Sequence, residues 1–92
     1  MGDAFDIVGE RKQIDYLTGR RWRKEKYEIT LRNHKDKDVE VKIREKFWRW
    51  ANWKIIDSSH PYEKRDSQTI EFSVKIEAKG DVRVTYMVKY WW

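Results

Sequence analysis

The chain has 92 residues, of which 40% are charged, with a formal net charge of +5 and no cysteine. This length fits one domain, covering residues 1–92, and a domain this small buries only about 60–65% of the surface that its unfolded chain exposes. Six tryptophans and five tyrosines supply apolar volume for a thin core. The lack of cysteine excludes disulfides and thiolate chemistry. No apolar run approaches the roughly 18 residues of a membrane helix, so no membrane span is expected.

The first predicted strand covers residues 5–8, Phe-Asp-Ile-Val. Gly9 follows it as an expected bend or bulge, because a glycine inside a strand pattern often marks one. Residues 13–17 can continue the strand, and Thr18-Gly19 ends it.

Period-two alternation then predicts two strands that each bury one face. Tyr27, Ile29 and Leu31 alternate with charged or polar residues, and the apolar positions of residues 39–47 continue in the same phase. Pairing Leu31 with Val41 in a hairpin places residues 35–37 in the loop and sets opposite charges across the two strands. In the second segment the inward positions are Val39, Val41, Ile43 and Phe47.

Residues 53–56 form a short predicted strand, and residues 57–67 are the longest turn-like stretch. Two further alternating segments follow, residues 70–76 and 82–92. If Ile76 faces Val82, they form a hairpin with Ala78-Lys79-Gly80 as its loop, in which Gly80 takes the left-handed conformation. The inward positions of the last strand are Val82, Val84, Tyr86, Val88, Tyr90 and Trp92.

About six strands with short connections and no helical periodicity predict an all-β domain. The expected architecture is an immunoglobulin-like sandwich of two antiparallel sheets.

Four segments resemble the C-terminal part of the family called "domain of unknown function 4139". They are residues 5–13 (FDIVGERKQ), 27–35 (YEITLRNHK), 57–62 (DSSHPY) and 82–86 (VRVTY). The resemblance spans nearly the whole chain but only the last portion of such proteins. It implies a β-sandwich at the C-terminal end of a longer bacterial protein, one that is exported or associated with the cell envelope. It implies no activity and no catalytic residue.

The chain departs from the family pattern at two turns. Arg49-Trp50-Ala51-Asn52 stands where the family has a short glycine-containing turn, and Ala78-Lys79-Gly80 replaces a proline-rich hairpin. The first departure adds a tryptophan beside basic residues, so the surface of this chain is expected to differ there.

Enzyme signatures are weak, and no catalytic residue, cofactor or metal is expected. Ser58-Ser59-His60 sets hydroxyls beside an imidazole, but neighbours on a bent loop more often tie the loop's backbone. Residues 33–38 are unsuited to a cation because lysines alternate with the aspartates. These patterns favour a non-catalytic domain.

Basic residues are concentrated in residues 20–54, where the net charge is +7 against −2 for the remainder. Tryptophans lie among them, and the phase of Trp48 and Trp50 is opposite to that of Phe47, so a buried Phe47 would turn both outward. We therefore expect a contact surface for other domains of the parent protein or for a like subunit. Packing of these tryptophans over the domain's own core is an equal alternative. The residues of the expected surface are Trp22, Arg23, Trp48, Arg49 and Trp50.

Two rival functions use the same surface. Basic residues interleaved with aromatic ones are typical of sites for single-stranded nucleic acid, and anionic glycans need the same charge. Nucleic acid is not the expected partner, because Glu25, Glu28, Glu40 and Glu45 interrupt the basic stretch and no RNA-recognition motif is present. The other rival is a carbohydrate-binding module that stacks sugars on tryptophan.

Overall fold

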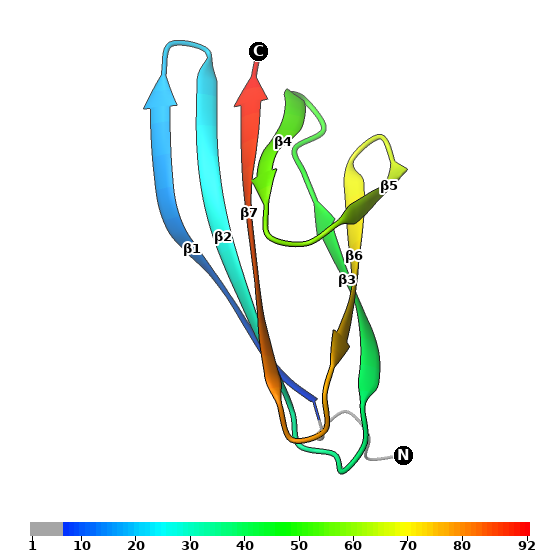
Figure 1. The fold of residues 1–92 in the computed structure, drawn as a ribbon. Coiled ribbons are helices and arrows are strands. Elements are labelled where there is room, and N and C mark those ends of the chain that lie inside the picture. The colour runs from blue at the N-terminus through cyan, green and yellow to red at the C-terminus, as the bar shows by residue number, and fades with distance from the viewer. Residues whose placement is uncertain (1–6) are drawn as a thin grey trace.

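The computed structural model describes residues 7–92, which form seven strands and contain no helix (Figure 1). No helix able to cross a membrane is therefore found in this part of the chain. The strands are β1 (Ile7–Gly19), β2 (Trp22–Asn33), β3 (Val39–Lys46), β4 (Asn52–Ser58), β5 (Tyr62–Asp66), β6 (Thr69–Ile76) and β7 (Asp81–Trp91).

The strands make two antiparallel sheets, one with the order β1-β2-β7-β4 and one with the order β3-β6-β5. The molecule is elongated, measuring 49 × 25 × 21 Å. The two sheets face each other across a single core (Figure 1). The predicted all-β class and the two antiparallel sheets are therefore confirmed. The β1–β2 hairpin reaches one end of the long axis, and the connections β2–β3 and β6–β7 lie at the other.

The core confirms the inward face predicted for residues 27–31, 39–47, 70–76 and 82–90, whereas β1, the longest strand, buries no side chain. Val84, Tyr86, Val88 and Tyr90 are buried along β7, and Phe47 is buried just after β3. The remaining buried apolar side chains come from β2, β4 and β6: Ile29, Leu31, Ile55, Ile70, Phe72, Val74 and Ile76. Among the inward positions predicted for residues 82–92, Trp92 is wrong: it lies just after β7 and is 44% exposed.

Both predicted hairpins are wrong. β2 pairs with β1 and β7, whereas β3 pairs with β6, so Leu31 lies opposite Gly9 and Val82, not Val41. Ile76 lies opposite Val39 for the same reason. The connections at residues 34–38 and 77–80 thus cross from one sheet to the other. Alternation determines which face of a strand is buried, but not which strand lies beside it. Two strands that both bury one face can pair in a hairpin or face each other from two sheets.

Asn33 ties the two crossing connections together. Its side chain is fully buried, and Nδ2 donates to the carbonyls of Lys37 (2.9 Å), Ile76 (3.2 Å) and Glu77 (3.1 Å). Its backbone N–H donates to the carbonyl of Gly80 (2.8 Å). The chain passes from one sheet to the other at these connections, where backbone carbonyls lack partners in a neighbouring strand. The buried amide of Asn33 supplies hydrogen bonds to three of them.

Three local predictions also change. The turn-like stretch 57–67 contains β5, an edge strand whose residues are all exposed and so carry no alternation. Gly9 sits in regular register, and the irregularity in β1 lies between Gln13 and Asp15. The left-handed residue of the 77–80 connection is Lys79 (φ 59°), not Gly80. Phe5 and Asp6 of the first predicted strand lie outside the described residues.

Candidate functional site

The tryptophans gather at one end of the long axis, which we call the tryptophan end. This end carries the β1–β2 turn, the β3–β4 connection, the start of β4 and the end of β7 (Figure 1). The register places the residues of β2, β4 and β7 in adjacent rows there. Its tryptophans are Trp22, Trp48, Trp50, Trp53, Trp91 and Trp92.

An aromatic ladder runs from the core to solvent on the inner side of the β1-β2-β7-β4 sheet. Trp48 stacks on buried Tyr90, with 4.1 Å between ring centroids, and on Trp50 at 5.1 Å. Trp92 meets Trp50 edge to face at 5.2 Å. Trp50 is 65% exposed although it is held on two sides. The aromatic ladder (Tyr90, Trp48, Trp50, Trp92) therefore ends in an exposed indole with a fixed orientation.

Arg23 borders this ladder. Its Nε donates to buried Glu25 at 2.5 Å, and its guanidinium carbon lies 4.9 Å from the ring centroid of Tyr16 and 6.0 Å from that of Trp48. The cation beside the aromatic ladder is thus already paired with the carboxylate of Glu25.

A second feature, the outer groove, lies on the opposite face of the same sheet. It has a volume of about 480 Å³ and is lined by Arg21, Trp22, Lys54, Ile56, Lys89, Trp91 and Trp92. None of its three cationic side chains has a carboxylate within 4 Å among residues 7–92. Lys24, opposite Lys89 in the register, adjoins the groove.

The four glutamates that interrupt the basic stretch in the sequence do not line this groove. Glu25 and Glu45 are buried on the inner side. Glu28 lies farther along β2, where it pairs with Arg83 at 3.3 Å, and Glu40 is on the other sheet. The outer groove is consequently more uniformly cationic than the sequence indicates.

The five residues of the expected contact surface are divided among three places. Trp48, Trp50 and Arg23 come together at the aromatic ladder. Trp22 points to the outer groove, because its position in β2 is out of phase with the inward residues. Arg49 lines a third hollow.

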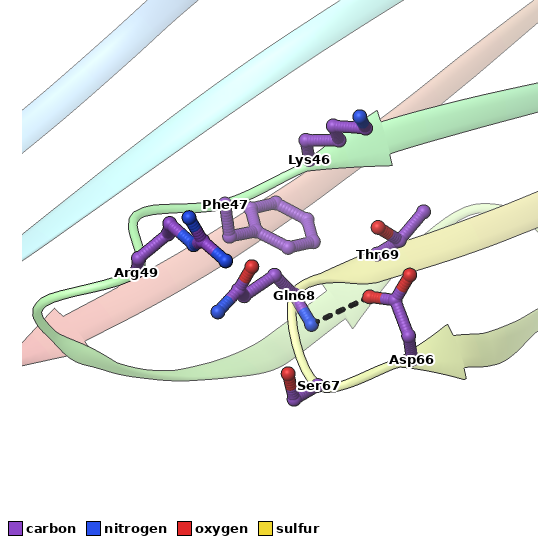
Figure 2. Close-up of a pocket in the computed structure, with 7 residues that line it drawn as sticks. All are labelled: Lys46, Phe47, Arg49, Asp66, Ser67, Gln68 and Thr69. Atoms are coloured by element: carbon purple, nitrogen blue, oxygen red, sulfur yellow. Dashed lines mark hydrogen bonds between the residues drawn. The ribbon is translucent and has the colours of Figure 1, made fainter.

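This third hollow, of about 570 Å³, lies between the β3–β4 connection and the β5–β6 turn (Figure 2). Its polar groups already serve the turn: the Asp66 carboxylate accepts from the backbone N–H of Gln68 at 2.8 Å, which lowers the pKa of that carboxyl. The N–H of Phe47 donates to the Gln68 carbonyl. The side chains of Lys46, Arg49, Ser67 and Gln68 also belong to its polar lining.

The serine–histidine loop is tied to β7. Ser59 Oγ lies 2.7 Å from His60 Nδ1 and accepts the backbone N–H of Thr85 at 2.9 Å. The N–H of Ser59 donates in turn to the Thr85 carbonyl. These contacts fit the expected role in holding the loop. Within residues 7–92, no cluster of three side chains suited to a metal ion occurs.

A buried polar network between the sheets was not anticipated. The Tyr86 hydroxyl donates to Glu45 Oε1 at 2.5 Å, and Arg11 Nε donates to the same oxygen at 2.8 Å. The arginine also lies over the ring of Tyr27, 4.1 Å from its centroid. One feature of the sequence indicates that Glu45 is buried: it has the same phase as the inward residues Ile43 and Phe47.

The core tyrosines predict a loss of stability in alkali. Burial raises the pKa of Tyr86, as does its bond to Glu45, and burial likewise raises that of Tyr90. The stabilisation is complete below pH 10, the ordinary tyrosine value. Above it the unfolded chain loses protons that the folded chain keeps, so stability falls by up to about 1.4 kcal/mol per pH unit for each tyrosine.

Urea unfolding from about pH 8 to about pH 11 measures this effect. The Tyr86→Phe variant should lose stability less steeply than the parent, since every lysine is the same in both. Parallel slopes in the two proteins would contradict the raised pKa of Tyr86.

Comparison with protein-family models, with curated proteins and with solved structures found no match to this chain. The geometry described above is therefore the basis for assigning a function.

Proposed function

We propose that this protein is a non-catalytic β-sandwich accessory domain that docks onto another protein surface through its aromatic ladder. The partner is another domain of its parent chain or a second copy. Trp50 carries the proposal, because it is exposed yet oriented by Trp48 and Trp92. A ring that is already ordered loses little conformational entropy on binding, and tryptophan is enriched among residues that dominate interface energies.

The immunoglobulin-like description belongs to this proposal. In a constant-type immunoglobulin sheet pair, the first, second, fifth and fourth strands share one sheet, and the third, sixth and seventh share the other. Five strands of this protein follow that layout: β1, β2 and β4 in one sheet, and β3 and β6 in the other. The remaining two, β5 and β7, have exchanged sheets. We infer a sandwich of related layout with its own topology.

The resemblance to the "domain of unknown function 4139" family fits an accessory role. Its quoted segments suggest placement at the C-terminal end of a longer bacterial protein and an exported or envelope location.

Replacing the exposed ring tests the docking proposal. Trp50→Ser should weaken self-association, or docking to the remainder of the parent chain, by about 30-fold or more, the effect of losing a dominant interface tryptophan. Sedimentation equilibrium and titration against the remainder of the parent measure the two. Tyr62→Ser is the control, because Tyr62 is an exposed aromatic on β5, in the other sheet.

Thermal unfolding of Trp50→Ser is expected to remain close to that of the parent, because the ring is mostly exposed. A folded Trp50→Ser variant that associates and docks as the parent does would refute the proposal. So would a parent domain that neither associates nor docks.

A further inference from the structure

The outer groove has an aromatic side built from two strands. Trp22 and Trp91 lie directly opposite each other on β2 and β7. The indole of Trp22 extends across β1 at Gly19, where an added Cβ would come within 2.1 Å of its Nε1. A side chain at position 19 would clash with this ring, so Gly19 allows the indole of Trp22 to lie on the outer face of the sheet.

A row of ammonium groups runs beside these rings. Lys24, Lys89 and Lys54 occupy matching register positions on β2, β7 and β4. Neighbouring strands lie about 4.8 Å apart, so the three side chains leave the same face at short, regular intervals. Arg21 adds a fourth cation at the β1–β2 turn. Like charges this close favour a ligand that carries several negative charges.

The lining side chains limit the chemistry of that ligand. Arginine, lysine and tryptophan supply N–H donors, isoleucine is apolar, and no side chain that lines the groove is a hydrogen-bond acceptor. Sugar hydroxyls need acceptors as well as donors, which disfavours neutral and hydroxyl-rich acidic glycans. Phosphodiester oxygens only accept, and nucleobases can stack without hydrogen bonds.

We infer that the outer groove binds single-stranded nucleic acid. Backbone phosphates contact Arg21, Lys24, Lys54 and Lys89, and bases stack on the indoles of Trp91 and Trp22. Lys24 Nζ lies 5.5 Å from the ring centroid of Trp22, so Lys24 turns from the ring to a phosphate when a base stacks there. This site lies on the opposite face of the sheet from Trp48 and Trp50, and it shares only Trp92, just after the end of β7, with the aromatic ladder. Of the two objections raised by the sequence, the one from charge does not apply here, because the four interrupting glutamates do not line the groove. The lack of an RNA-recognition motif excludes that fold and not a site built on a β-sandwich.

Fluorescence anisotropy of a labelled oligothymidylate of about 12 nucleotides, titrated with the whole chain, tests the inference. Trp91→Ala should weaken binding about 5- to 150-fold, the cost of one lost base–ring stack. Trp22→Ala should act similarly, although it also uncovers Gly19. Tyr62→Ser, an exposed aromatic on the other sheet, is the matched control and should bind as the parent does. Trp50→Ser, whose ring reaches the groove only through Trp92, should weaken binding far less than Trp91→Ala does, which separates this site from the docking proposal.

The salt dependence of binding tests the phosphate contacts without removing a packed ring. Between about 50 and 200 mM salt, each lost contact should reduce the slope of log affinity against log salt by about 0.7. Lys54→Gln with Lys89→Gln should thus lower it by about 1.4. Lys42→Gln with Lys75→Gln, on the other sheet, makes the same change in net charge and should leave the slope nearly unchanged.

Three results would overturn the inference. One is unchanged affinity in a folded Trp91→Ala variant. Another is an equal loss of slope in the two lysine pairs, which would mean general electrostatic attraction. The third is equally tight binding, at the same residues, of polygalacturonate or of phosphatidylcholine vesicles containing phosphatidylserine, which would assign the groove to an acidic glycan or a lipid surface.

Discussion

Val84→Asp is expected to remove most or all of the stability of this domain. Val84 is fully buried in the central strand β7, opposite Ile29 of β2, with the second sheet over it. Burying an ionised carboxylate without a partner costs several kcal/mol. The entire stability of a domain is only about 5–15 kcal/mol. Urea unfolding followed by tryptophan fluorescence measures the loss.

The neighbouring residue provides the control for this prediction. Arg83 is exposed and lies 3.3 Å from Glu28 across the strand pair. Arg83→Asp introduces the same residue and loses a surface ion pair, which should cost about 1 kcal/mol. Similar losses in the two variants would show that the inward and outward faces of β7 are wrongly assigned.

Glu45→Ala should produce the second largest loss, about 2–3 kcal/mol. The substitution leaves the buried hydroxyl of Tyr86 without its acceptor, and water cannot easily reach it. Arg11 also loses its partner, but its side chain is about half exposed and can be hydrated, which limits the cost. The measurement is again the free energy of unfolding in urea.

Two variants make this prediction specific. Glu40→Ala, at an exposed position of the same strand, should change stability by less than about 0.5 kcal/mol. Tyr86→Phe combined with Glu45→Ala should cost less than the sum of the single changes, because the two groups share one hydrogen bond. A Glu45→Ala variant as stable as Glu40→Ala would contradict the buried network.

The sequence was sufficient to predict the faces of the strands but not their partners. Alternation correctly predicted that Val84 and Ile76 face inward, because burial on one face of a strand requires a period of two. The same alternation led to two false hairpins, since a strand with one apolar face can lie beside its neighbour in sequence or across the core from it. Asn33 binds both connections that cross between the sheets, and in the sequence it stands at the start of the polar stretch 33–38, where nothing indicates that its amide is buried.

The composition of the tryptophan end was predictable from the sequence, but its arrangement was not. Aromatic and basic residues near positions 20–24 and 47–50 pointed to a contact region. The outer groove, however, needs Lys54, Lys89 and Trp91, which reach it only because β2, β7 and β4 are adjacent in one sheet. The adjacency of β7 to β2 and β4 is the strand order that the false hairpins obscured.

The most direct test of the account is ¹⁹F NMR of the chain labelled with 5-fluorotryptophan, with each signal assigned by a Trp→Phe variant. Adding the oligothymidylate should shift the signals of Trp22 and Trp91 and leave those of Trp50 and Trp53 in place. Trp50 should instead respond to a docking partner or to self-association. Shifts confined to Trp48 and Trp50 on adding the oligonucleotide, or no shift at all, would contradict the assignment of separate roles to the two faces.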